Sequence, residues 1–238
     1  MIVGTAVCPH PPLLLRELTG GQDVGADLRK ACEAAVASLV ALGPEVLVVV
    51  GGADTGGRRE PGPAPVRAFG GTESAGGAGG SGTRPEEGAL PLSLGVAGRL
   101  LDAVGGAVPV DMYAVAFDAG PGPVAELADA IARRPERVAL LVMGDGSARR
   151  GVKAPGHLDE RAFAYDERVR RALAGADPSA LLGLEPGLAA ELLAAGRAAL
   201  QVMAAAVARG GASYRPEVLY ADDPFGVMYT VAVWSCDC

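Results

Sequence analysis

The chain has 238 residues, of which 50% are hydrophobic and only 4% aromatic, so we expect one domain over residues 1–238 with a core of alanine, valine and leucine. A formal net charge of -7 at pH 7 argues against binding to nucleic acid or to an anionic membrane surface, because both need a basic footprint. The sequence shows neither a signal peptide nor an apolar run of the roughly 18 residues that span a membrane, so we expect a cytoplasmic protein. In that compartment, the four cysteines are expected to be free thiols.

The N-terminal part of the chain alternates between strand and helix signals. Residues 2–7 are rich in β-formers and end at Cys-Pro-His-Pro-Pro, which predicts a strand followed by a loop at the sheet edge. Residues 27–42 have apolar side chains at helical spacing and stop at Gly-Pro, which predicts a helix. Residues 45–50 show no alternation of apolar and polar side chains, which predicts a central strand buried on both faces.

Residues 51–88 interrupt this alternation. They are dense in glycine, proline, serine and arginine and contain few large apolar side chains, which predicts a long flexible Gly-rich loop. Residues 77–82 fit the pattern G-x-G-x-x-G, but no strand precedes them and no helix follows. The context that a nucleotide-binding motif needs is therefore missing.

The second half of the chain continues the alternation and then changes. The predicted elements are helix 92–104, strand 110–117, helix 124–133, strand 137–143, helix 158–174, a helical turn beginning at Asp177-Pro178, and helix 188–208. Two apolar runs at 217–221 and 227–234 flank Asp-Asp-Pro-Phe-Gly, which predicts a closing β-hairpin. We therefore expect an α/β fold with helices on both faces of a mostly parallel central sheet and a C-terminal antiparallel hairpin.

The segment after the strand at 137–143 holds most of the polar chemistry. It reads MGDGSARRGVKAPGHLDERA over residues 143–162, and open α/β sheets place their sites at such strand ends. The catalytic candidates in this segment are Asp145, Ser147 and His157. The ligand-binding candidates are Arg149, Arg150 and Lys153, which together with loop N–H groups would hold a phosphate or carboxylate. In the alternative interpretation, the aspartate caps the turn and the arginines are solvated or form salt bridges.

Other catalytic classes find less support. The segment is not a phosphate-binding Walker loop, and no G-x-S-x-G nucleophile elbow is present. Serine or cysteine catalysis would depend on His157 as the base, which makes a hydrolase unfavourable. Around the final hairpin, Tyr220, Asp222, Asp223 and Tyr229 are either substrate contacts or residues of ordinary turn chemistry.

Three stretches together resemble a known superfamily. They are VCPHPPLL at residues 7–14, LLVMGDGSARR at 140–150 and LAAELLAAGRAALQVMAAA at 188–206, with an apolar strand ending in Gly-Gly between the first two. In this order, the chain is similar to the class III extradiol ring-cleavage dioxygenases of the B-subunit type, a superfamily that also includes the Memo proteins. The resemblance implies a three-layer α/β/α sandwich, homodimer assembly and, in active members, an Fe(II) centre that cleaves a catechol ring.

The superfamily's functional positions are mostly replaced in this sequence. The first metal ligand of the family matches His10, so the resemblance makes this residue the metal candidate. The second ligand position reads Gly51-Gly52-Ala53-Asp54 without a histidine, and the third, before Gly-Arg, is Ala195. The acid–base histidine that follows Asp-x-Ser in the family is Ala148 here. Alanine neither binds a metal nor shuttles protons, so the resemblance implies a divergent branch.

Two other metal sites are compatible with the sequence. The chain has only two histidines, so a rebuilt facial triad for Fe(II) would need both His10 and His157, with Asp54, Asp118 or Asp145 as the carboxylate. Alternatively, Cys8 and His10 at one end of the chain and Cys236 and Cys238 at the other offer a donor set that zinc accepts.

Two hypotheses for function follow. In the first, the chain is an active non-haem Fe(II) catechol-cleaving dioxygenase with a rebuilt site. In the second, it lacks the standard Fe(II) site and binds a small anionic or aromatic ligand in the ancestral cleft, either without catalysis or with altered chemistry. The loss of ligand positions favours the second hypothesis.

Overall fold

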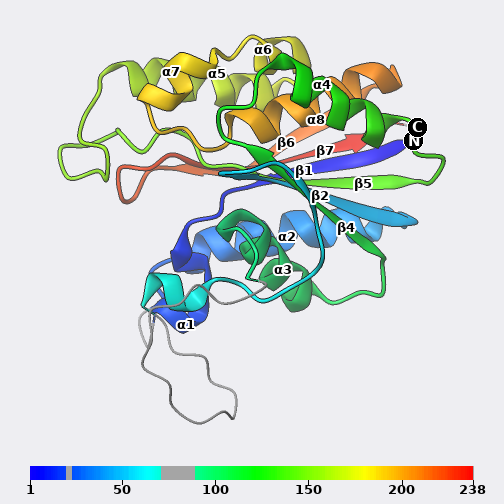
Figure 1. Cartoon of the computed structure of the whole chain (residues 1–238), viewed down its shortest axis with the longest axis horizontal. Coiled ribbons are helices and arrows are strands. Elements are labelled where there is room, and N and C mark those ends of the chain that lie inside the picture. Colours follow the sequence, from blue (N-terminus) through cyan, green and yellow to red (C-terminus); the bar gives the residue numbers. More distant parts are fainter. Residues whose placement is uncertain (20–22, 71–88, 238) are drawn as a thin grey trace.

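The computed structural model describes residues 1–19, 23–70 and 89–237, and it shows an α/β fold built on a seven-stranded mixed sheet (Figure 1). The strands lie side by side in the order β3-β4-β2-β5-β1-β7-β6. Their bounds are β1 Ile2–Cys8, β2 Val46–Ala53, β3 Gly57–Arg59, β4 Val110–Ala116, β5 Val138–Met143, β6 Tyr214–Asp222 and β7 Tyr229–Cys236.

The expectation of a mostly parallel sheet is wrong. Three neighbouring pairs are parallel, namely β4 with β2, β2 with β5, and β5 with β1. The other three pairs, β3 with β4, β1 with β7, and β7 with β6, are antiparallel. The chain reverses between β2 and β3, so β3 runs antiparallel to β4, which is parallel to β2. The strands β6 and β7 are joined by a short turn, as antiparallel strands allow. The predicted C-terminal hairpin is present, and β7 also continues the sheet beside β1.

Helices lie on both faces of the sheet (Figure 1). On the face drawn below the sheet are η1 Pro12–Leu14, α1 Arg16–Thr19, α2 Ala26–Ala41, η2 Val66–Phe69 and α3 Leu92–Val104. On the opposite face are α4 Pro121–Ala132, α5 Arg161–Ala174, α6 Pro178–Leu182, α7 Pro186–Glu191 and α8 Arg197–Gly210. Within the described residues, no helix combines the length and the apolar character that crossing a membrane requires.

The central strands are apolar throughout because each contributes to two cores. In β2, Val48 and Val50 pack into the core on the α8 side, whereas Leu47 and Val49 pack into the core on the α2 side. Successive side chains of a strand point to opposite faces, so a strand covered on both faces needs apolar residues at every position. The same reasoning explains β5, which is buried along its whole length, and the predicted burial of residues 45–50 is confirmed for 46–50, whereas Glu45 is exposed.

The predicted helix at 188–208 is in fact two helices, α7 and α8, with a break between them. Leu193 in the break adopts a φ of 53°, which a continuous helix does not allow. The break brings the start of α8 against the end of β5. An added Cβ on Gly144 would lie 2.7 Å from the Cα of Gly196, so this contact is possible only between two glycines.

Residues 51–70 contain more regular structure than a flexible loop. The strand β2 continues to Ala53, the three residues of β3 pair with β4, and η2 follows. Residues 71–88, including the G-x-G-x-x-G match at 77–82, lie outside the described residues.

Candidate functional site

The segment that follows β5, residues 144–150, is fixed by backbone hydrogen bonds to the end of β1 and to the residue just before β7. The N–H of Gly144 donates to the carbonyl of Cys8 at 2.9 Å, at the end of β1. Beyond that point, β1 leaves the sheet, and the segment pairs directly with the residue just before β7. Gly146 donates to the carbonyl of Met228 at 2.9 Å, and Met228 donates to the carbonyl of Ser147 at 3.0 Å. The segment therefore has a defined backbone from which its side chains project.

His10 and Asp145 meet at this strand end. The backbone N–H of His10 donates to Oδ1 of Asp145 at 2.7 Å, and the ring Nδ1 lies 3.7 Å from the same oxygen. The imidazole is buried, and Nδ1 has no hydrogen-bond partner among the described residues. The structure thus brings together two of the predicted site residues, the metal candidate and one catalytic candidate.

The hydroxyl of Ser147 is committed to local structure. Ser147 is fully buried, its Oγ donates to the carbonyl of Leu192 at 2.8 Å, and the same oxygen accepts the N–H of Arg149 at 3.1 Å. This arrangement ties the segment to the break between α7 and α8. The contribution of Ser147 to the site is its backbone N–H, which donates to Oδ1 of Asp166 at 2.9 Å.

Arg150 is the centre of a charged cluster on the α5 side of the sheet. Its Nε donates to Oδ2 of Asp223 at 2.6 Å, and its Nη1 donates to Oδ2 of Asp166 at 3.3 Å. The guanidinium carbon also lies 4.6 Å from the centroid of the Phe163 ring, within the range of a cation–π contact. One side chain therefore joins the 144–150 segment to α5 and to the β6–β7 turn.

Asp166 is the group in this cluster whose pKa is most clearly perturbed. Only 2% of its surface is exposed, and this burial raises the pKa of its carboxyl to about 6, because the charged form loses hydration. The N–H of Ser147 and the guanidinium of Arg150 oppose that rise, whereas the negative charge of Asp223 adds to it. A raised pKa in a cleft beside an arginine is a frequent property of binding and catalytic sites.

An open cleft of about 390 Å³ lies directly over this cluster, between α5 and the β6–β7 turn. This volume falls within the usual range of small-molecule sites. The lining residues are Arg150, Phe163, Asp166, Glu167, Arg170, Ala221, Asp222, Asp223 and Met228.

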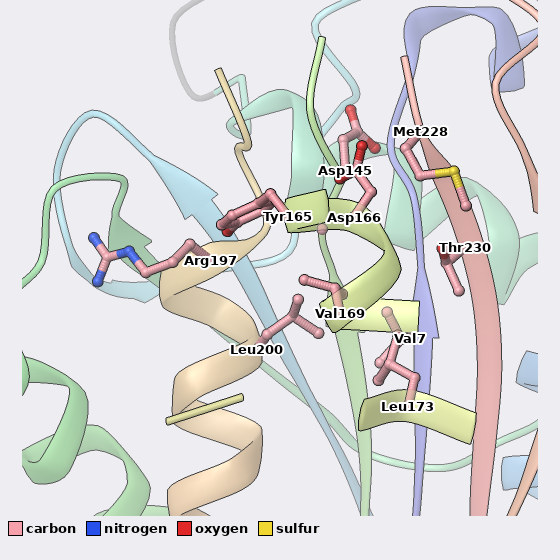
Figure 2. A pocket seen from close by; sticks show the side chains of 12 residues that line it. Val7, Asp145, Tyr165, Asp166, Val169, Leu173, Arg197, Leu200, Met228 and Thr230 are labelled. Atoms are coloured by element: carbon pink, nitrogen blue, oxygen red, sulfur yellow. The ribbon is translucent and has the colours of Figure 1, made fainter. Parts of the chain in front are cut away.

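A much smaller cavity lies behind Asp166 and Asp145, toward the sheet (Figure 2). Its volume of about 10 Å³ is enough for about one water molecule, so it holds no ligand. The stem of Arg197 lines this cavity beside Tyr165, but its guanidinium points away from it (Figure 2). There it donates to the carbonyls of Phe117 and Ala119 at 2.7 and 2.5 Å.

The other predicted site residues take no part in the cleft. Lys153 and His157 are exposed on the loop before α5, and the N–H of His157 donates to the carbonyl of Ala154 at 3.0 Å. Arg149 is partly buried, and its Nε has no hydrogen-bond partner among the described residues. The functional roles of these three residues stay predictions.

The donor set at the strand ends does not fit the Fe(II) centre that the resemblance implies. His10 faces Asp145, but Ala53 and Ala195 supply no donor atom, and Asp54 is exposed. Over residues 1–19, 23–70 and 89–237, no group of three or more His, Cys, Asp or Glu side chains is arranged to hold a metal ion. We therefore derive no chemical step through iron.

The zinc site built from both chain ends does not form either. Cys8 is the last residue of β1, whereas Cys236 is the last residue of β7, and β7 runs antiparallel to β1 with Gly4 opposite Ser235. The two sulfurs are therefore at opposite ends of β1. Cys8 and Cys32 are buried free thiols, but Cys236 is disulfide-bonded, so the expectation of four free thiols is wrong. Cys238 lies outside the described residues.

The hairpin residues divide between the two sides of the segment. Asp222 and Asp223 line the cleft, as a role in substrate contact would require. Tyr229 is buried, and both its burial and the negative charge of Asp145 raise the pKa of its hydroxyl. Tyr229 does not line the cleft.

Sequence reasoning missed Asp166 and Phe163, which complete the cluster. A signal for Asp166 was present, because it falls three residues before Val169 and seven before Leu173, on the apolar face of a predicted helix. A carboxylate on such a face must find a donor inside the protein. Which donor it finds cannot be read from that spacing.

Comparisons with known proteins add little to this description. The sequence matches no family model and no curated protein. Among solved structures, an uncharacterized protein from Escherichia coli K12 is similar, with 13% sequence identity and a TM-score of 0.46 over 98% of this chain and 99% of that chain. The assignment of the fold therefore depends on the strands and helices described above.

Proposed function

We propose that this chain is an extradiol dioxygenase-like protein, with the three-layer α/β/α arrangement of that superfamily, that binds a small aromatic anion without the standard Fe(II) site. The observation that supports this function most directly is the position of Arg150. Its guanidinium lies over the Phe163 ring at the floor of a cleft of about 390 Å³. A cation next to an aromatic face is suited to a ligand that has a carboxylate or sulfonate on an apolar ring.

Arg150 keeps enough freedom to receive an anion. Its contact with Asp223 involves a carboxylate whose side chain is 33% exposed, so water can take over the hydration of Asp223 when a ligand replaces it. The Phe163 ring is 40% exposed and available for stacking. At the rim, Glu167 is already paired with Arg170 and Arg171, so its charge is largely neutralised.

The binding test uses benzenesulfonate as the probe and benzamide as its neutral match, measured by isothermal titration calorimetry at about pH 6, near the pKa of the buried carboxyl. We expect saturable binding of benzenesulfonate and no binding of benzamide. Arg150→Met should weaken binding by about tenfold or more, because a charge-assisted contact contributes more than 1.4 kcal/mol. No benzenesulfonate binding, or equal binding of both probes, would overturn the proposal.

Two further variants make the result specific to the cleft. Lys153→Met removes one positive charge from the same loop at an exposed position that does not line the cleft, so it should leave the affinity unchanged. Phe163→Leu removes the ring without disturbing the buried ion pair and should weaken binding even if Arg150→Met is too unstable to study. Equal losses in Lys153→Met and Arg150→Met would indicate attraction by overall charge instead of a site.

A further inference from the structure

An anionic ligand in the cleft would be repelled by a buried carboxylate. An anion placed on Arg150 would also lie near Asp166, whose Oδ2 is 3.3 Å from Nη1 of the same guanidinium. The side chain of Asp166 is 1% exposed, so little water is available to screen its negative charge from a ligand. Two negative groups sharing one guanidinium in a poorly hydrated place is unfavourable, unless one of them becomes neutral.

Building on the proposed function, we infer that the cleft takes its anionic ligand together with one proton, which is held by the buried carboxyl of Asp166. With the proton bound, Asp166 no longer competes with the ligand for Arg150. It still accepts the N–H of Ser147 at 2.9 Å through Oδ1, so the 144–150 segment keeps its position. The ligand is therefore a small anion, and its uptake is coupled to the uptake of one proton.

The groups around Asp166 single it out as the proton acceptor. From the 144–150 segment it faces Arg150 and the N–H of Ser147, and from the β6–β7 turn it faces Asp222 and Asp223. From α5 itself, Glu167 and Arg170 line the same cleft. The small cavity behind Asp166 is lined by Tyr165 of α5, by Asp145 and by Arg197 of α8. The hydrogen bond from Arg170 lowers the pKa of Glu167, and burial raises the pKa of the Tyr165 hydroxyl. Both pKa values therefore move further from pH 7, so neither group takes up a proton there.

The titration range of Asp166 is also suitable. Its pKa of about 6 leaves the free site mostly ionised at neutral pH, where binding must recruit a proton. Below that pKa, the proton is already present and the affinity should level off. Above it, the apparent dissociation constant should rise about tenfold for each pH unit, since one proton is taken up for each ligand bound.

The experiment measures the affinity of the full-length protein for benzenesulfonate between about pH 5 and about pH 8, a range that covers both protonation states of the site. This probe stays ionised throughout, so any dependence on pH belongs to the protein. Calorimetry in buffers of different ionisation enthalpy counts the protons taken up. We expect uptake approaching one proton per ligand above about pH 7 and the tenfold loss of affinity per unit described above.

Asp166→Asn and Glu167→Gln provide the matched comparison. Asparagine imitates the protonated carboxyl, so Asp166→Asn should bind with the low-pH affinity at every pH and should take up no proton. Glu167→Gln removes a neighbouring carboxylate that lines the same cleft and should retain the pH dependence. Binding without proton uptake, or an unchanged pH profile in Asp166→Asn, would overturn the inference while leaving the proposed function intact. No binding in any variant at any pH would instead overturn the proposed function.

Discussion

Asp166 influences the stability of the protein as well as its proposed ligand site. Its folded-state pKa of about 6 exceeds the ordinary aspartate value of 3.8, so the folded protein binds the proton more tightly than the unfolded chain does. Stability therefore falls as pH rises from about 4 to about 6, because the buried carboxyl must ionise within the fold. This is the opposite of the usual behaviour of a salt-bridged aspartate.

Asp166→Asn should remove that cost. Relative to the wild type, the free energy of unfolding of the variant should increase with pH by up to about 3 kcal/mol between about pH 4 and about pH 7. Urea denaturation at a series of pH values measures this difference. A constant difference between the two proteins at all pH values would mean that Asp166 titrates alike in the folded and unfolded states.

Arg197 is a second buried charge, and its surroundings are different. It is 2% exposed and donates to the carbonyls of Phe117 and Ala119 and to Oε1 of Gln201, with no carboxylate partner among the described residues. Burial lowers the pKa of its guanidinium. The side chain therefore holds the β4–α4 turn to α8 through acceptors of which two, the oxygens of Ala119 and Gln201, are in buried contacts.

Arg197→Met should destabilise the fold by about 2 kcal/mol, because it removes the donor from these oxygens, including the two in buried contacts. Arg171→Met is the control. The Arg171 side chain is 73% exposed, and its loss should change stability by less than about 0.5 kcal/mol. Chemical denaturation of both variants gives the comparison, and equal stabilities would show that the carbonyls find other partners.

At the scale of whole elements, the start of α8 packs against the carboxyl end of β5. Gly144 and Gly196 touch backbone to backbone, and the N–H of Gly196 donates to the carbonyl of Asp145 at 2.8 Å. This contact fixes the 144–150 segment, so the positions of Arg150 and Ser147 depend on it. Neither backbone can move to admit a side chain without shifting a strand or a helix.

Gly144→Ala should therefore destabilise the protein by about 2 kcal/mol or more and should weaken ligand binding as well. Gly98→Ala is the control within a helix: nothing lies within 4 Å of its added Cβ, so the substitution should stabilise α3 by about 0.5 to 1 kcal/mol. Thermal denaturation should show a lower melting temperature for Gly144→Ala and a higher one for Gly98→Ala than for the wild type. An unchanged melting temperature in Gly144→Ala would mean that the strand and the helix separate readily.

At the scale of the whole molecule, the distribution of donor atoms decides which chemistry is available. Protein prepared anaerobically and offered Fe(II) should retain well below one iron per chain after desalting, because a facial triad needs three donors and the described residues bring no such group of side chains together. Metal analysis with and without His10→Ala measures this. Stoichiometric iron that is lost in His10→Ala would instead support the ring-cleaving alternative. Homodimer assembly and the cytoplasmic location stay predictions.

The sequence alone determined the elements whose burial is encoded in local patterns. The apolar runs at 45–50 and 137–143 identified β2 and β5, since a strand covered on both faces has no polar positions. The spacing of apolar residues identified α2 and α3, and the Asp-Pro-Phe-Gly stretch identified the hairpin. It also predicted site residues in the stretch 143–162, Arg150 among them, and their functional roles stay predictions.

Only the tertiary structure decided how these elements meet. The placement of β7 beside β1 makes the sheet mixed, and this depends on pairing across more than 200 residues, which no local pattern encodes. Arg150 contacts Asp166, which is 16 residues away in the sequence, and Asp223, which is 73 residues away. The sequence patterns around these two aspartates predict only a helix and a turn. The raised pKa of Asp166 has the same origin, because burial and neighbouring charges are properties of the packed fold rather than of the residue itself.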